Sequence, residues 1–179
     1  MTIYKAILFG CLFLTSVASG AAEPADPLKT AEALPVSTPA TPSDKAAEIL
    51  SSALGLVGVK YKYGGRSPES GLDCSGFVGH VFHNTVGLVL PRSASAISMV
   101  GSKIAQNELR PGDLVFFKTM RKAISHVGIY LGDNQFVHAS SSKTGDVMVS
   151  NMTEKYWSKH FSVARRVELS TPSSVKPAE

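Results

Sequence analysis

Cys74 carries the sharpest chemical signal in the sequence, within the run Asp73-Cys74-Ser75-Gly76. An apolar stripe at helical spacing follows, and Asp73 stands where a helix N-cap belongs, so a helix is predicted to begin at Cys74. The unpaired N–H groups and the dipole of a helix N-terminus would stabilise a thiolate, or an oxyanion that forms beside it. A buried, unreactive cysteine is the alternative. The polar residues around Cys74 favour the reactive interpretation.

Two histidines within otherwise apolar strand patterns, His126 and His138, are the candidate partners of this thiol. A thiol hydrolase needs a general base and a group that orients the base. With an ideal tight turn at residues 133–134, His138 would pair opposite residue 129 rather than 126. The two imidazoles therefore meet only through a bulge, a curled hairpin or a tilted reach. The other histidines are expected at the surface: His80, His83 and His160.

Other roles are open for the same three side chains. One cysteine and two histidines could bind zinc, and each histidine could simply make a structural hydrogen bond. The sequence has no pair of histidines four residues apart, however, and no fourth ligand stands out. We therefore expect a catalytic arrangement without a metal or a cofactor.

The first 22 residues are typical of a secretory signal peptide, with Lys5 before an apolar segment at 6–17 and small residues at 18–22. The apolar run is short for a membrane span, which needs roughly 20 residues. The sequence up to Cys11 resembles a lipobox, but the apolar run continues past it. A lipid anchor at Cys11 is therefore less favoured than an ordinary secretory signal peptide.

Export makes the cysteine count informative, because the chain has two cysteines and one of them lies in the signal peptide. Cys74 then has no internal disulfide partner, and a single cysteine in an exported protein is either reactive or pairs between chains. The formal net charge is +4, with a pI near 9.1, which suits an anionic polymer of the cell envelope. Lysines and arginines do not form a stripe interleaved with aromatic residues, so no nucleic-acid partner is expected. A monomer is expected.

Composition divides the chain into four parts. Residues 23–43 hold five of the ten prolines and are predicted to be a linker, and residues 170–179 a flexible tail. The domain between them, residues 44–169, begins with a helix near Ser43 or Asp44. Strands are predicted at 114–117, 126–131, 135–139, 147–149 and 163–167. Helices first and strands afterwards predict an α+β fold with an antiparallel sheet.

Several short motifs stand in order along this domain. They are Tyr61-Lys62-Tyr63-Gly64-Gly65, Gly71-Leu72-Asp73-Cys74-Ser75-Gly76-Phe77-Val78, Leu90-Pro91-Arg92-Ser93, Leu109-Arg110-Pro111-Gly112-Asp113-Leu114-Val115-Phe116-Phe117, His126-Val127-Gly128-Ile129-Tyr130-Leu131-Gly132, Phe136-Val137-His138-Ala139-Ser140, Tyr156-Trp157 and Ala164-Arg165-Arg166-Val167. Together they resemble the NlpC-type cell-wall cysteine peptidases, and within that family the MepS-like murein endopeptidases. Many MepS-like members are lipoproteins, and the N-terminus departs from them in lacking a convincing lipobox.

The resemblance implies a papain-like α+β fold, with N-terminal helices packed on a small antiparallel sheet. It implies Cys74 as nucleophile, His126 as proton acceptor and donor, and His138 as the residue that orients His126. Tyr61 matches a tyrosine near the oxyanion, while Asp73 and Ser75 flank the nucleophile and line the substrate groove. Among the other motif residues we expect structural roles for Arg92 and Asp113, packing for Tyr156 and Trp157, and ion pairs or solvation for Arg165 and Arg166.

The implied substrate is peptidoglycan, cut at an amide bond of a stem peptide or cross-link. The D-alanyl–diaminopimelate bond is favoured, and the γ-D-glutamyl–diaminopimelate bond is the alternative. A non-catalytic wall-binding module, or an acyltransferase or amidase on a related fold, is also open. The expected location is the periplasm of a Gram-negative bacterium, with a lipid anchor in the outer membrane or secretion as alternatives.

Overall fold

The computed structural model describes residues 41–120, 123–141 and 145–169. The predicted signal peptide, Cys11, most of the predicted linker and the tail at 170–179 lie outside the described residues. No helix of the described part is long and apolar enough to cross a membrane.

The first helix, α1 (Pro42–Gly55), begins slightly earlier than the sequence predicts. Thr41 rather than Ser43 is its N-cap, because Thr41 forms a capping box with Asp44 and proline suits the first helical position. Next come β1 (Arg66–Ser67) and β2 (Gly71–Leu72), which pair as a short hairpin. They lead into α2 (Cys74–Val86), whose C-cap is Gly87, in the left-handed conformation.

The remaining elements form mostly a sheet. They are α3 (Ala94–Ile97), β3 (Ser102–Ile104), a 3-10 turn (Gln106–Glu108), β4 (Leu114–Phe117), β5 (His126–Gly132), β6 (Gln135–Ala139), β7 (Val147–Asn151), α4 (Lys155–His160) and β8 (Phe161–Arg166). The larger sheet has the order β3-β8-β4-β5-β6-β7, and every neighbouring pair is antiparallel. The α+β prediction is confirmed, and the sequence analysis did not predict β1, β2, β3, the 3-10 turn or α4.

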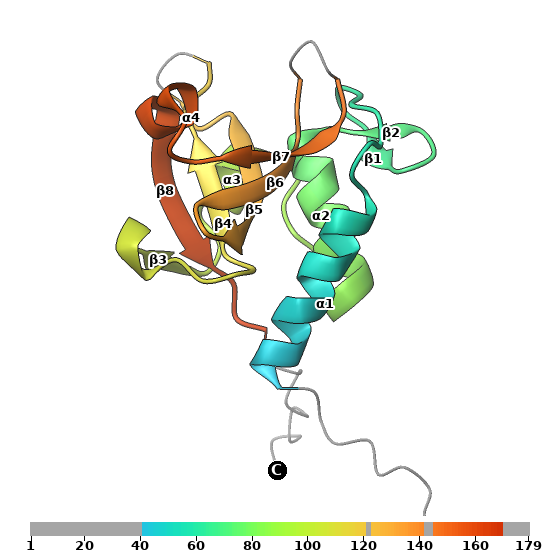
Figure 1. Ribbon diagram of the computed structural model, residues 1–179. Helices are drawn as coiled ribbons and strands as arrows, with labels where there is room; N and C mark the ends of the chain where they lie inside the picture. The colour runs from blue at the N-terminus through green and yellow to red at the C-terminus, as the bar shows by residue number, and fades with distance from the viewer. Residues whose placement is uncertain (1–40, 121–122, 142–144, 170–179) are drawn as a thin grey trace, which may run out of the picture. The chain divides into compact units, whose positions relative to one another are not determined.

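Both faces of the sheet are buried. Leu114 and Phe116 of β4 pack with α1 and α2 in one core, whereas the alternate residues Val115 and Phe117 belong to a second core with Trp157. Figure 1 shows α1 and α2 together on one side of the strands. The cysteine helix therefore rests on the strands that carry both candidate histidines.

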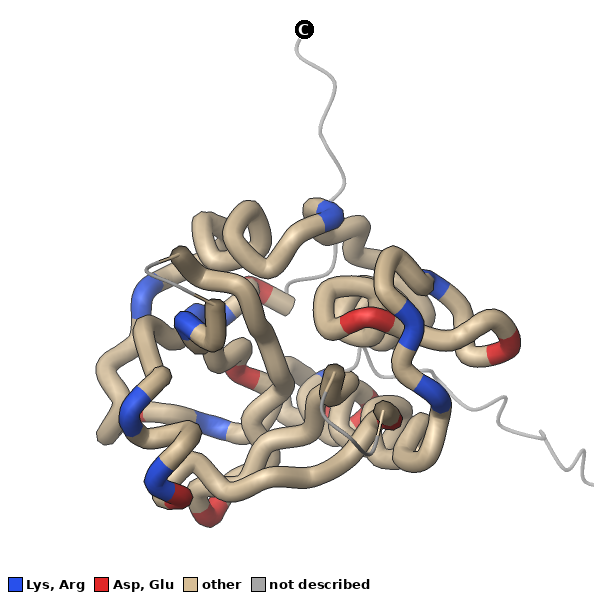
Figure 2. The backbone as a smooth tube through the Cα atoms, turned by 90° about the horizontal axis from the view of Figure 1, so that it is seen from above, with Lys and Arg blue, Asp and Glu red and all other residues tan. Residues whose placement is uncertain are grey.

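Asp113 has the structural role that its turn motif predicts. It accepts two hydrogen bonds from the Arg166 guanidinium, at 2.8 and 2.7 Å, and one from the N–H of Arg110. This bidentate pair joins the start of β4 to the end of β8. Figure 2 shows lysines and arginines spread around the described trace and mixed with acidic residues.

Candidate active site

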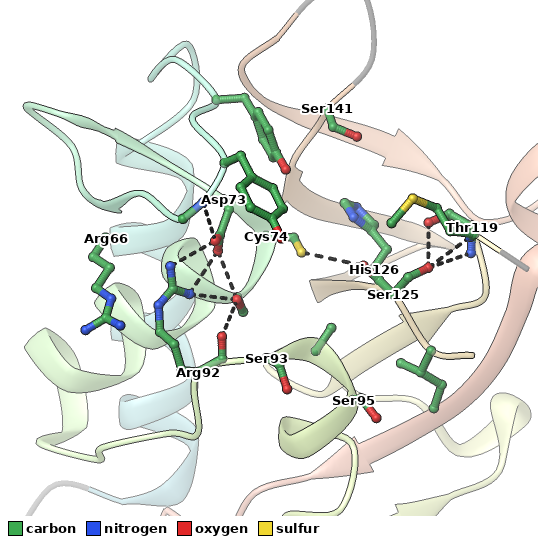
Figure 3. Close-up of a pocket in the computed structure, with 17 residues that line it drawn as sticks. Arg66, Asp73, Cys74, Arg92, Ser93, Ser95, Thr119, Ser125, His126 and Ser141 are labelled. Carbon is green, nitrogen blue, oxygen red and sulfur yellow. Dashed lines mark hydrogen bonds and ion pairs between the residues drawn. The ribbon is translucent and has the colours of Figure 1, made fainter.

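Cys74 is the first residue of α2, as predicted, and Asp73 is the N-cap whose carboxylate accepts a 2.6 Å hydrogen bond from the N–H of Gly76. A β-carbon at Gly76 would lie 2.0 Å from the carbonyl oxygen of Gly65, so only glycine allows this close approach. Cys74 borders a cavity of about 490 Å³, and its thiol lies 3.9 Å from the Ser125 carbonyl oxygen (Figure 3).

Asp73 is held on the side of this cavity away from His126 (Figure 3). The Arg92 guanidinium donates to its two carboxylate oxygens at 3.0 and 2.8 Å, and the Ser75 hydroxyl lies 2.9 Å from one of them. A further bond runs from Arg92 to the Gly65 carbonyl oxygen. Arg92 thus has the predicted structural role. Asp73 and Ser75 border the cavity as expected, but their polar side-chain atoms are engaged in this network.

The two imidazoles meet: His126 Nε2 lies 2.8 Å from His138 Nδ1. The β5–β6 register shifts between Tyr130 and Gly132, so His138 lies beside Gly128 rather than opposite residue 129. This register shift is one of the three arrangements that the sequence left open. Gly128 has no side chain, and even a β-carbon there would lie 3.2 Å from that of His138. His138 can therefore reach diagonally to His126.

Ser150 on β7 is a site residue that sequence reasoning missed. Its hydroxyl lies 2.9 Å from His138 Nε2, so that both ring nitrogens of His138 have partners. His126 uses Nε2 for His138, which leaves Nδ1 as the nitrogen available to Cys74. Met148 pairs with His138, and Ser150 lies two residues further along β7, on the same face of the sheet. The sequence could have indicated Ser150 only if the register of β6 and β7 had been known.

Aromatic rings surround this histidine pair. Trp157 stacks on His126 with ring centroids 5.6 Å apart and meets the edge of His138 at 4.9 Å. Phe136 stacks on the His138 ring, with ring centroids 4.8 Å apart. The predicted packing role of Trp157 is thus at the site itself, where it shields the two imidazoles from water.

Burial controls the protonation of these groups. Burial, and after it the negative charge of Asp73, raises the pKa of the Cys74 thiol to about 11, although N–H groups of Val127, Ser75 and Cys74 act against the rise. Burial lowers the pKa of His126 to about 4. Burial, and after it the positive charge of His126 in its protonated form, lowers the pKa of His138 to about 3. These shifts favour a neutral thiol and neutral imidazoles near neutral pH, unlike the thiolate that the helix start suggested, because loss of hydration outweighs the helix N–H groups.

Tyr61 also borders the cavity, as predicted, and burial raises the pKa of its hydroxyl above the usual value, with the negative charge of Cys74 in its thiolate form as the next cause. Tyr63, two residues on, is 89% exposed at the rim. Within residues 41–120, 123–141 and 145–169, no group of three or more histidines, cysteines and acids is arranged to hold a metal ion.

Comparison with known proteins identifies the family. The sequence model of the NlpC/P60 family matches residues 58–166, and the chain belongs to this family. It is 48% identical over 110 residues to "Murein DD-endopeptidase MepS/Murein LD-carboxypeptidase" of Escherichia coli strain K12, a match that covers 62% of this chain and 56% of that protein. The match thus spans just over half the length of that relative.

Two further likenesses cover more of the chain. The "Gamma-DL-glutamyl hydrolase" of Bacillus subtilis is 38% identical over 139 residues, which is 77% of this chain and 33% of that one. The crystal structure of an NLP/P60 family protein of Staphylococcus aureus superposes with a TM-score of 0.63 at 32% identity, covering 74% of this chain and 44% of that one. The likeness to solved family members places the α+β arrangement described above within the NlpC/P60 fold.

Proposed function

We propose that this protein is an exported thiol endopeptidase that cleaves amide bonds in peptidoglycan. The observation that carries the proposal is the arrangement at the cavity wall, where Cys74 begins α2 and His126 is held by a 2.8 Å hydrogen bond to His138. Membership of the NlpC/P60 family and the name of the E. coli relative support peptidoglycan as the substrate.

The proposed reaction begins with attack of Cys74 on the amide carbonyl carbon. His126 Nδ1 accepts the thiol proton as the carbon–sulfur bond forms, because the thiol is neutral at rest. The first N–H groups of α2 stabilise the oxyanion, with Tyr61 close by. His126 then gives the proton to the leaving amine, and water attacks the thioester to regenerate Cys74 and release the acid.

His138 has the orienting role in this proposal. Its Nδ1 accepts from His126 Nε2–H, which fixes the His126 tautomer with a free lone pair on Nδ1, the nitrogen that accepts the thiol proton in the proposed reaction. The favoured bond is the D-alanyl–diaminopimelate cross-link, as the MepS-like sequence suggests. The second candidate, the γ-D-glutamyl–diaminopimelate bond, is favoured by the likeness to the B. subtilis γ-glutamyl hydrolase over 77% of the chain.

The test is mass spectrometry of muropeptides after purified sacculi are incubated with residues 23–179 or with the Cys74→Ala variant. We expect loss of cross-linked dimers and gain of monomers, with the variant inactive. Fragments that end at glutamate would instead establish the γ-glutamyl cleavage. Binding to sacculi with no change in muropeptides would favour the non-catalytic wall-binding module. Transfer of the acyl group to an added amine would favour the acyltransferase.

A further inference from the structure

A second hollow adjoins the cavity of Cys74 along the outer face of α2. It has a volume of about 260 Å³ and shares Arg66, Ser75 and Arg92 with the catalytic cavity. Its floor comes from one face of the helix, including Gly79 and His80. We call it the α2 hollow. Because the two spaces share three wall residues, one extended substrate could occupy both.

Gly79 has no side chain, and this leaves the space of the α2 hollow open above the helix. Glycine inside a helix is unfavourable relative to alanine, because it loses more backbone freedom on folding. At Gly76 an added β-carbon would strike the Gly65 carbonyl, but at Gly79 it would meet no atom within 4 Å. Packing therefore requires glycine at position 76 and not at position 79. A side chain at position 79 would fill the α2 hollow.

One arginine in the wall of the α2 hollow, Arg66, has a charge that no carboxylate of the described residues neutralises. Two arginines and two histidines line it, and no aspartate or glutamate is among its lining residues. Arg92 is already paired with Asp73. Arg66 is exposed and forms no ion pair with the described residues. The acid that contacts these walls is Asp73, which is bonded to Arg92, Ser75 and Gly76. Glu69 lies outside the lining residues and interacts with His80.

The position of the hollow indicates which part of a substrate it would hold. In Figure 3, Arg92 and Arg66 lie on the side of Cys74 opposite His126. The leaving amine must lie beside His126 to receive its proton. The arm on the opposite side is therefore the acyl arm, which stays attached to Cys74 until hydrolysis.

We propose that the α2 hollow is a subsite for the acyl arm of the peptide substrate, with Gly79 as its floor and Arg66 binding a carboxylate of that arm. This inference rests on the proposed function for the identity of the substrate. It predicts that substrates are selected by a carboxylate several bonds away from the amide that is cut.

The test measures binding in the Cys74→Ala background, so that it does not depend on turnover. The probe is a purified cross-linked muropeptide dimer with free carboxylates, and the same dimer with its carboxylates amidated. Gly79→Leu should raise Kd for the free dimer about tenfold by filling the hollow. Gly55→Leu is the matched control, because a β-carbon at Gly55 in α1 also meets no atom within 4 Å. Both variants should fold.

Charge is tested separately with Arg66→Gln, which should weaken binding of the free dimer about fivefold and leave the amidated dimer unchanged. Lys103→Gln, an exposed cation on β3, is its control. Equal Kd values for Gly79→Leu and Gly55→Leu would overturn the subsite, and so would an equal effect of Arg66→Gln on both dimers. Turnover by the wild-type protein is measured in parallel. Its absence would count against the proposed function, whereas the binding results decide the subsite.

Discussion

At the scale of single residues, the site combines groups whose neighbours determine their protonation. Cys74 lies at a helix N-terminus, which favours a thiolate, but the Cys74 side chain is partly buried and lies beside the carboxylate of Asp73. Both effects favour the neutral thiol, and its pKa is raised to about 11. The proposed reaction therefore depends on proton transfer to His126 during attack rather than on a preformed ion pair.

Alkylation of Cys74 tests this protonation state. An ordinary thiol has a pKa of about 8.5, so its reaction rate levels off above about pH 9. We expect the rate of Cys74 with iodoacetamide to rise about tenfold per pH unit from pH 7 to 10 without levelling off. Free cysteine is the control for the reagent. A plateau already present at pH 7 would instead indicate a thiolate–imidazolium pair.

Ser150 acts through His138 as a positioning residue. With His126 Nε2–H donating to His138 Nδ1, His138 carries its proton on Nε2 and must donate it to the Ser150 hydroxyl. Ser150→Ala removes that acceptor, and we expect kcat to fall about tenfold with little change in KM. Ser150→Thr retains the hydroxyl and should restore activity.

The direct readout for Ser150 is ¹⁵N NMR of histidine-labelled protein. In the wild type, the chemical shifts should report His126 and His138 both protonated at Nε2, and Ser150→Ala should give a mixture of tautomers. An unchanged histidine spectrum together with full activity would show that Ser150 does not orient the pair.

At the scale of elements, the start of α2 is positioned by one carboxylate that makes several bonds at once. Asp73 caps the helix through Gly76 and pairs with Arg92, which also holds Gly65. Burial by itself would raise the pKa of Asp73, but the hydrogen bonds from Arg92 and the Gly76 N–H lower it below its usual value. The same contacts that fix the helix start thus keep a negative charge beside Cys74.

Substitution of Asp73 separates these contributions. Asp73→Ala loses the cap and leaves Arg92 without its partner, so the free energy of unfolding should fall by about 2 kcal/mol. Asp73→Asn keeps an acceptor for the Gly76 N–H, should destabilise less, and should lower the pKa of Cys74 because the nearby charge is gone. Urea unfolding and the alkylation profile measure the two effects.

Thr41→Ala is the matched control for Asp73, because it removes a comparable cap from α1 at a distance from the cavity. It should reduce stability by about 1 kcal/mol without changing the alkylation of Cys74. If Asp73→Asn left the alkylation profile unchanged, the charge of Asp73 would have no part in setting the thiol pKa.

At the scale of the whole molecule, the buried histidines link folding to pH. Both have folded-state pKa values below the value of about 6.5 expected in an unfolded chain. The unfolded state therefore binds more protons between pH 6.5 and about 4, and the free energy of unfolding falls as the pH falls through this window. Well above pH 6.5 neither state binds these protons, so they no longer lower the free energy of unfolding.

Urea unfolding at pH 7 and pH 5 measures the linkage. We expect a loss of about 2 kcal/mol for each histidine at pH 5, relative to a protein without this linkage. The double variant His126→Gln, His138→Gln should show a much flatter dependence, whatever its stability at pH 7. A wild-type slope equal to that of the double variant would show that the histidines are not held neutral in the folded protein.

Much of the fold could be predicted because its signals are local. The capping aspartate, the apolar stripe after Cys74 and the left-handed glycine at position 87 define α2 within a single stretch of chain. A continuous apolar run likewise defines β4, and the alternation of Val127, Ile129 and Leu131 defines β5. The shortest elements, such as β1 and β3, lack such signals, since two or three residues carry no periodicity and are held by their sheet partners.

The candidate catalytic residues could be named from residue type and motif order, but their assembly depended on tertiary structure. Whether His126 and His138 touch depends on a register shift between Tyr130 and Gly132, which residue counting does not specify. Ser150 joins the pair only through the pairing of β6 with β7. The protonation of Cys74 likewise follows from burial, because hydration is lost only when α2 packs on the sheet.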